Sequence, residues 1–123
     1  MFSDDKKKFK FDGVYNKEIA QKRKNARIPV EIKGTFVYMD VDNKIVDKCI
    51  ITNLSTGGLA FETNAVLLRG DIITISFPLS GTIIKEEAQI TRNTGREVGC
   101  RSLLPDPRNV DIIQQYIYKK LFS

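Results

Sequence analysis

The segment "IPVEIKGTFVYMDVDNKIVDKCIIT", residues 28–52, decides the fold class. Apolar and polar side chains alternate from Ile28 to Met39, and a period of two is typical of a half-buried β-strand. Residues 40–44, "DVDNK", are rich in turn-forming side chains, and the β-branched run "IVDKCIIT" follows them. The segment therefore predicts two antiparallel strands joined by a short turn, with the first strand bent near Gly34.

Four more strand-like segments follow, and the links between them are short. They are "LAFET" (59–63), "IITISFPL" (72–79), "TIIKEEAQITR" (82–92) and "EVGCRSL" (97–103). In the second of these, Ile73, Ile75 and Phe77 share one face. The loop "NTGR" (93–96) provides Gly95 for a backbone with positive φ. Six strands without crossover helices predict an antiparallel barrel or sandwich.

The last segment, "PDPRNVDIIQQYIYKKLF" (105–122), changes to a helical period. Asp106 and Pro107 suit the N-cap and the first helical position, and Lys119 and Lys120 suit the C-terminal end of the helix dipole. The apolar stripe comprises Ile112, Ile113, Tyr116, Ile117 and Leu121. We expect this stripe to cover the open mouth or a face of the barrel, or alternatively to contact a second subunit.

The positive charge is concentrated in the N-terminal quarter. The net charge is +5; residues 1–33 hold ten Lys and Arg against five acids, and the other 90 residues hold ten of each sign. This distribution fits an anion-binding arm on a neutral body, and it equally fits a solvated tail. We predict a basic, flexible arm over residues 1–21 and one domain over residues 22–123, with the barrel at about 28–104 and the helix at about 107–122.

The arm contains Phe9, Phe11 and Tyr15, and Asn16 is a candidate N-cap for a helical turn in "NKEIAQKRK". One interpretation is a flexible tail whose aromatic side chains pack on the body of the domain. A basic arm with aromatic residues also suits contact with nucleic acid or a membrane surface.

Several kinds of site are disfavoured by composition. The chain has no histidine and no CxxC pair, which argues against a zinc site and against Ser-His or Cys-His nucleophiles. Glu86 and Glu87 would point to opposite faces of a strand, so they cannot form a catalytic dyad. Cys49 and Cys100 lie in apolar runs and are expected to be buried, reduced thiols. We therefore predict a protein that is not an enzyme and needs neither metal nor cofactor.

No apolar run is long enough to cross a bilayer, and the start "MFSDDKKKFKF" lacks the apolar region of a secretory signal. A cytoplasmic location is the expectation.

Two short polar segments are candidates for a ligand site. In "RKNAR" (23–27), Arg23 and Arg27 are four residues apart, and the planar guanidinium group binds phosphates and the guanine edge in a bidentate manner. In "NLSTGG" (53–58), Asn53 and Ser55 offer donors and acceptors, while Gly57 and Gly58 permit positive φ and close approach of a ligand. Taken separately, the first also reads as a solvated charged stretch and the second as a turn that caps its own amides.

Together and in this order, "RKNARIPVEI" and "NLSTGGL" resemble the PilZ domain family, whose members carry an RxxxR motif on an N-terminal arm and a D/NxSxxG motif at the third strand. The strands "AQITR" and "EVGCR" and the helix "IIQQYIYKKL" extend the resemblance from about Lys22 to Phe122. The resemblance implies a six-stranded antiparallel β-barrel with a C-terminal helix. It also implies a bacterial receptor for the second messenger cyclic di-GMP.

Under this resemblance, Arg23 and Arg27 would contact the guanines and phosphates, and Asn53, Ser55 and Gly58 would complete the pocket. Weaker candidates for the same site are Lys22, Lys24, Gly57, Arg92 and Arg101. Two positions depart from the usual pattern. Asn53 replaces the commoner Asp, and Ser102 stands where the family usually has a bulky apolar residue.

The resemblance implies an adaptor whose ligand-dependent surface regulates an unidentified protein partner in motility, exopolysaccharide or biofilm control. The alternative is a PilZ-like interaction scaffold that binds no nucleotide. Binding of DNA or RNA is not expected, because the body is neutral and no strand shows an exposed aromatic row. A monomer and a homodimer are both compatible with the sequence.

Overall fold

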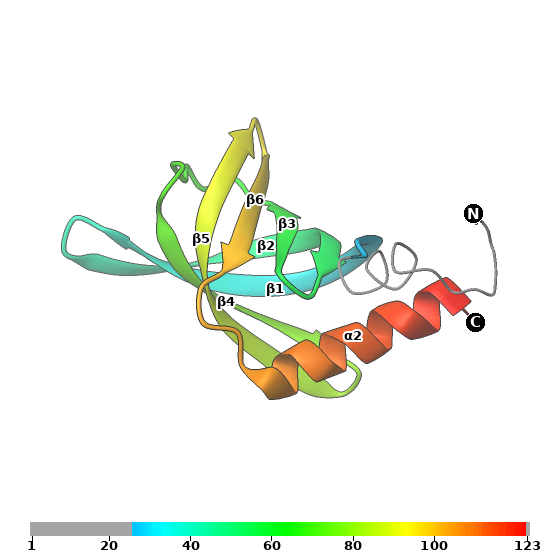
Figure 1. Cartoon of the computed structure of the whole chain (residues 1–123). Helices are drawn as coiled ribbons and strands as arrows, with labels where there is room; N and C mark the ends of the chain where they lie inside the picture. Colours follow the sequence, from blue (N-terminus) through cyan, green and yellow to red (C-terminus); the bar gives the residue numbers. More distant parts are fainter. Residues whose placement is uncertain (1–25, 123) are drawn as a thin grey trace, which may run out of the picture.

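The computed structural model describes residues 26–122. The predicted arm, Asn16, Lys22, Arg23 and Lys24 therefore lie outside the described residues. Six strands precede one helix: β1 (Ile28–Asp40), β2 (Asn43–Ser55), β3 (Gly58–Glu62), β4 (Ile72–Leu79), β5 (Thr82–Thr94), β6 (Glu97–Ser102) and α2 (Pro107–Phe122) (Figure 1). The expected number and order of elements are confirmed.

The strands form one closed antiparallel barrel in the order β1-β2-β3-β6-β5-β4. Closure depends on the pairing of β1 with β4, in which Thr35 lies opposite Ser76 and Val37 opposite Thr74. Gly34 permits this close approach, since a Cβ at that position would lie 2.8 Å from the carbonyl oxygen of Ser76. The register irregularity of β1 falls between Pro29 and Ile32, whereas the sequence predicted a bend near Gly34.

The β1–β2 hairpin is longer and its turn shorter than predicted. Asp40 pairs directly with Asn43, so only Val41 and Asp42 remain in the turn. Val41 has a φ of 57° and takes up a conformation that a β-branched residue rarely adopts. The tip of the hairpin projects away from the barrel (Figure 1). At the β5–β6 turn, Gly95 has the expected positive φ, 69°.

The barrel interior is filled by alternate residues of the six strands. Ile73, Ile75 and Phe77 are all buried on one face of β4, as predicted. The rings of Phe36 and Phe61 pack in its centre with centroids 5.3 Å apart. Burying such side chains is the main stabilising contribution to a domain of this size.

The helix α2 begins where the sequence predicted. Asp106 is the N-cap, because its Oδ1 accepts a hydrogen bond of 2.9 Å from the amide of Arg108 and its carbonyl accepts one from the amide of Val110. Hydrogen bonds from the Arg108 side chain and amide lower the pKa of Asp106. Ile113 and Ile117 are buried in the core cluster, and α2 lies against β2 and β4 (Figure 1). Of the two expected partners for the apolar stripe, the structure places the barrel against it.

Candidate functional site

The second motif spans the end of β2, a tight turn and the start of β3. Leu54 is fully buried in the barrel, so its neighbours Asn53 and Ser55 face outward on β2. Ser55 lies opposite Gly58 of β3, and Gly58 in turn lies opposite Arg101 of β6. The barrel wall thus places Asn53, Ser55, Gly58 and Arg101 on one outer surface, which we call the motif face.

Gly58 is required for the close approach of β3 and β6. A Cβ on Gly58 would lie 2.3 Å from the carbonyl oxygen of Cys100, a backbone atom that cannot move aside cheaply. Neither Gly58 nor Gly57 has a positive φ, so the expectation that these glycines supply a left-handed backbone is wrong. Gly57 is exposed with open space around its Cα. The constraint on Gly58 comes from strand packing.

The turn between the strands is held by its own polar groups and by β6. The hydroxyl of Ser55 donates a hydrogen bond of 3.0 Å to the carbonyl of Gly58. The amide of Ser102 donates one of 3.0 Å to the carbonyl of Gly57. Ser55 therefore takes part in the turn, but its hydroxyl donates to a carbonyl and does not cap an amide as the sequence interpretation held. Its hydroxyl oxygen keeps acceptor capacity for another group.

Two β-bulges flank the centre of the motif face. In β2, Thr52 and Asn53 together lie opposite Ala60, and in β5, Thr91 and Arg92 together lie opposite Gly99. Ala60 and Gly99 are themselves a cross-strand pair, so the two bulges lie on either side of a floor of small residues. A bulge re-aims the side chains of its strand.

Each bulge has a threonine whose hydroxyl reaches the neighbouring strand. Thr91 Oγ1 lies 3.2 Å from the carbonyl oxygen of Gly99, and Thr52 Oγ1 lies 3.3 Å from that of Ala60. Thr91 lies next to Arg92 and donates to the Gly99 carbonyl, whereas Thr52 lies next to Asn53 and shares its one hydroxyl proton between the Ala60 carbonyl and the Glu97 carboxylate.

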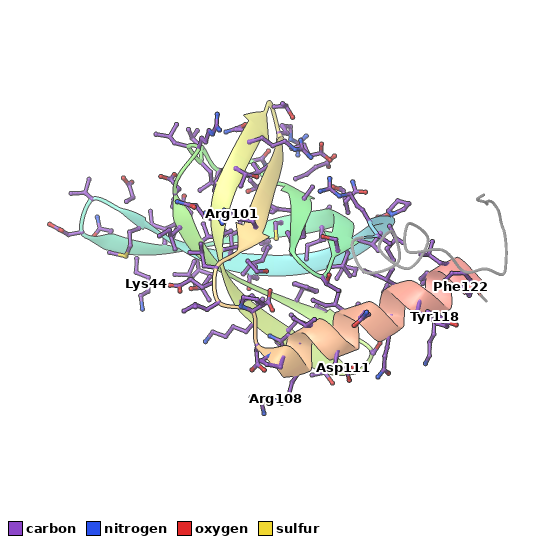
Figure 2. All side chains as sticks on the ribbon, in the orientation of Figure 1. Lys44, Arg101, Arg108, Asp111, Tyr118 and Phe122 are labelled. Atoms are coloured by element: carbon purple, nitrogen blue, oxygen red, sulfur yellow. The ribbon has the colours of Figure 1, made fainter. Side chains whose placement is uncertain are left out.

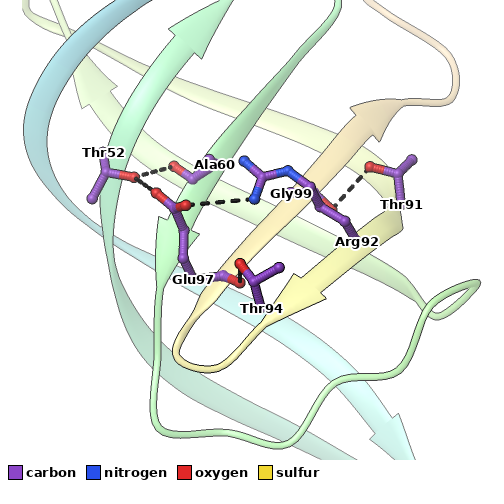
Figure 3. Close-up of polar contacts among 7 residues, drawn as sticks. All are labelled: Thr52, Ala60, Thr91, Arg92, Thr94, Glu97 and Gly99. Atoms are coloured by element: carbon purple, nitrogen blue, oxygen red, sulfur yellow. Dashed lines mark hydrogen bonds and ion pairs between the residues drawn. The ribbon is translucent and has the colours of Figure 1, made fainter.

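Glu97 of β6 connects the two bulges. Its Oε2 lies 3.1 Å from Thr52 Oγ1, and its Oε1 lies 3.5 Å from Arg92 Nη1 (Figure 3). The side chain of Arg92 lies over Gly99, where an added Cβ would come within 2.9 Å of its Cγ and Nε. The carboxylate of Glu97 is 35% exposed and the guanidinium side chain of Arg92 is 42% exposed, so both groups remain accessible to a ligand.

Within residues 26–122, two other cationic candidates lie at neighbouring positions. Arg101 is exposed on β6 (Figure 2). It donates a hydrogen bond of 2.9 Å to the Gln89 side chain on β5. Arg27 is exposed and immediately precedes β1; because Ile28 pairs with Leu54, Arg27 lies beside the Ser55 end of β2. The described part of the site therefore carries three arginines around a floor of small residues.

Three polar residues of the two bulges and their connection were not predicted: Thr52, Thr91 and Glu97. No motif marks them, and Thr52 and Glu97, which are in contact, are 45 residues apart in the chain. The weak signal in the sequence was the pair of threonines that precede Asn53 and Arg92, since a bulge needs an extra residue with a side chain that can bond to the backbone.

Comparison with known proteins identifies the fold and its family. The sequence profile of the PilZ domain matches residues 21–119. The chain belongs to the PilZ domain family. A search of curated proteins finds no match.

Solved structures of PilZ domains share this barrel. The PilZ domain of CeSA from a cellulose-synthesizing bacterium is 20% identical, with a TM-score of 0.60 over 77% of this chain and 97% of that one. The PilZ domain of Escherichia coli YcgR with c-di-GMP is 17% identical, with a TM-score of 0.62 over 80% and 91%. Bacillus subtilis MotI, an inhibitor of motility, is 15% identical, with a TM-score of 0.67 over 79% of this chain and half of that protein. At these identities the likeness establishes the fold.

The inner side of the same strands carries a second polar contact. Glu86 and Glu87 point to opposite faces, as predicted; Glu86 is 9% exposed, and its Oε1 accepts a hydrogen bond of 2.6 Å from Ser102 Oγ. Ser102, one of the two departures from the usual family pattern, is therefore the hydrogen-bond partner of an inward-facing carboxylate. Within residues 26–122, Glu86 Oε2 has no hydrogen-bond partner.

Both cysteines are buried free thiols, as predicted. Burial raises the pKa of Cys49 to about 11 and that of Cys100 to about 12, and in Cys100 the nearby Glu86 carboxylate adds to the effect. In the described part of the chain, no cluster of three or more Cys, Asp or Glu side chains is arranged to hold a metal ion. None of the helices formed by residues 26–122 has the length and apolarity needed to span a membrane.

Proposed function

We propose that this protein is a cyclic di-GMP receptor that binds the dinucleotide on the motif face. The observation that carries the proposal is the placement of Asn53, Ser55, Gly58 and Arg101 on one outer surface in a PilZ domain, beside the exposed Arg27. Cyclic di-GMP is a dianion with two guanine bases. It needs cationic groups for its phosphates, hydrogen-bonding groups for the guanine edges, and a flat surface for close approach.

Each proposed residue has a role that follows from its place. Arg27, together with Arg23, would bind phosphate and stack on or hydrogen-bond to guanine from the segment before β1. Asn53 and Ser55 would contact the base and sugar-phosphate from β2. Arg101 and Arg92 would approach from the far side of the floor, and Lys22 and Lys24 would add positive potential. Gly58 contributes by holding β3 and β6 close together, because a side chain at this position would push the two strands apart.

The output of binding is a change of surface. A ligand held between the segment before β1 and the barrel wall would fix that segment in a new position, and a partner protein would recognise the difference. MotI, which has the same fold, is an inhibitor of motility, and YcgR has been solved with c-di-GMP. The first neighbour supports a regulatory role in motility, and the second supports binding of cyclic di-GMP. We propose that the present protein regulates motility, exopolysaccharide production or biofilm control as a cytoplasmic protein that does no chemistry of its own.

Calorimetric titration with cyclic di-GMP tests the proposal, with GTP and single-stranded RNA as control ligands. We expect binding of cyclic di-GMP alone. Arg23→Ala and Arg27→Ala should each abolish detectable binding and leave the thermal unfolding temperature of the free protein almost unchanged. For Arg27 the reason is its exposure, because surface charges of this kind contribute little to stability.

Lys44→Ala is the matched control. It removes one positive charge near the turn of the β1–β2 hairpin (Figure 2), at the opposite end of β2 from Asn53 and Ser55. It should leave affinity within about twofold of the unmodified protein. Unchanged affinity in both arginine variants would contradict the assignment. A folded protein that binds no cyclic di-GMP would support the interaction scaffold instead.

A further inference from the structure

The motif face carries a carboxylate that a site built only for phosphates would not need. Glu97 is 35% exposed, and its ion pair with Arg92 is long, at 3.5 Å. A carboxylate beside a dianionic ligand raises the free energy of the complex unless it meets hydrogen-bond donors of that ligand. The position of Glu97 therefore calls for donors on the ligand.

Guanine supplies such donors. Its Watson–Crick edge presents N1–H and the 2-amino group side by side, and the two oxygens of a carboxylate can accept both at once, in the same parallel geometry that carboxylates use with arginine. A carboxamide such as that of Asn53 has a single acceptor oxygen. Adenine presents an acceptor at N1, which a carboxylate would repel.

The fold places Glu97 near Asn53, the motif residue that we propose contacts the base. The bulge in β2 turns Thr52 and Asn53 to the same side of the strand, opposite Ala60. Thr52 Oγ1 is 3.1 Å from Glu97 Oε2, so the carboxylate lies within one residue of Asn53 although it comes from β6. Both oxygens of Glu97 are oriented, one by Thr52 and one by Arg92, and each retains a further acceptor position.

We propose that Glu97 reads the guanine edge of the bound dinucleotide, with Thr52 and Arg92 positioning its carboxylate. The inference rests on the proposed function and deepens it, because it names the residue that gives this site its preference for guanine. Glu97 supplies the charged acceptor that Asn53 does not.

The competing explanation is that Glu97 only holds Arg92 in place for a phosphate. The two explanations differ in what a base analogue would show. If Glu97 acts on the phosphate through Arg92, removal of its charge weakens the binding of every cyclic dinucleotide by the same factor. If Glu97 reads guanine, removal of its charge weakens binding most for the ligand that has the 2-amino group.

The experiment measures dissociation constants for cyclic di-GMP and for its inosine analogue, cyclic di-IMP, which lacks the 2-amino groups. The full-length protein is compared with Glu97→Gln. We expect the unmodified protein to prefer cyclic di-GMP by at least about tenfold, since a hydrogen bond to a charged group is of that order. Glu97→Gln should lower that preference by about fivefold or more. Glu97→Asp keeps the charge but withdraws the oxygens by one methylene group, and it should lose the preference in the same way.

Glu62→Gln is the matched control. Glu62 lies directly opposite Glu97 in the β3–β6 ladder and is exposed, so the change removes the same charge from the neighbouring position. It should leave the preference within about twofold of the unmodified value.

The outcomes distinguish failure of the proposed function from failure of the proposed role of Glu97. Absence of cyclic di-GMP binding by the unmodified, folded protein would refute the proposed function itself. Binding by the unmodified protein with the same cyclic di-GMP to cyclic di-IMP ratio in Glu97→Gln would overturn only the role of Glu97. A loss of preference in Glu97→Gln and Glu97→Asp, with Glu62→Gln unchanged, would establish it.

Discussion

The barrel wall carries one glutamate on its outside, Glu97, which links β6 to β2 and β5, and one on its inside, Glu86, which links β5 to β6. On the outside, both carboxylate oxygens of Glu97 have partners, one in Thr52 and one in Arg92, and its side chain is one-third exposed. On the inside, one carboxylate oxygen of Glu86 accepts a hydrogen bond from Ser102, and the residue is 9% exposed. Water can solvate the outer group, so its interactions are available to a ligand at little cost in stability. Within residues 26–122 the inner group has one hydrogen-bond donor, Ser102, so we expect this contact to matter for stability.

The two faces of the same strands therefore have different roles, the inner face in stability and the motif face in binding. Changes on the inner face, or in the backbone contacts between the strands, should alter stability. Changes to polar groups on the motif face should alter binding and leave stability almost as it was.

The largest expected effect comes from the backbone contact that both faces share. Gly58→Ala would place a methyl group 2.3 Å from the Cys100 carbonyl oxygen, so β3 and β6 would have to separate. We expect a loss of about 3 kcal/mol or more in the free energy of unfolding, measured by urea denaturation. Gly57→Ala, where nothing lies within 4 Å, should change it by less than about 0.5 kcal/mol. A stable Gly58→Ala variant that merely fails to bind ligand would show that this glycine serves the ligand and not the wall.

The inner glutamate gives the next largest effect. Ser102→Ala removes the only described donor to Glu86 and should cost about 2 kcal/mol, the desolvation penalty of a buried carboxylate that has lost its hydrogen bond. Glu86→Leu combined with Ser102→Ala replaces the pair by apolar groups and should restore or exceed the original stability. If Ser102→Ala unfolds at the same urea concentration as the unmodified protein, the inner contact has no role in stability.

The buried thiols give a smaller, pH-dependent effect. The pKa of Cys100 is about 12 in the folded protein against 9.0 for an unperturbed thiol. The stability that this difference contributes is therefore complete below about pH 9 and is lost as the pH rises toward 12. Between pH 8 and pH 10 the unmodified protein should lose about 1 kcal/mol more than Cys100→Ala, because only its unfolded state can release the thiol proton in that range. Equal slopes in the two proteins would mean that the thiol titrates normally in the native state.

The smallest effect is expected at the outer glutamate. Glu97→Gln should change the free energy of unfolding by less than about 0.5 kcal/mol, since partly exposed ion pairs contribute little to stability. Thermal and urea denaturation of the ligand-free protein measure this change. A loss as large as that of Ser102→Ala would remove the distinction between the two faces and would make Glu97 a structural residue first.

The local features of this protein followed from its sequence. Alternation in residues 28–39 and 72–79 predicted strands because a period of two is visible within a single segment. Asp106 and Pro107 predicted the start of α2 because capping involves residues that are adjacent in the chain. The order of "RKNAR" and "NLSTGG" identified the family, because each motif is contiguous.

What the sequence could not determine is how distant segments meet. Three contacts show this, and each joins residues of different strands that are 41 to 45 positions apart in the chain. They are the pairing of Thr35 with Ser76 that closes the barrel, the contact of Gly58 with Cys100, and the approach of Glu97 to Thr52. A glycine in a turn-like motif suggests positive φ, yet Gly58 is needed for close packing, which depends on the neighbouring strand. Periodicity and capping depend on residues that are close together in the chain. Strand register and the close approach of neighbouring strands depend on every strand of the closed barrel. Only the tertiary structure could decide that Glu97 and Asn53 lie on one face.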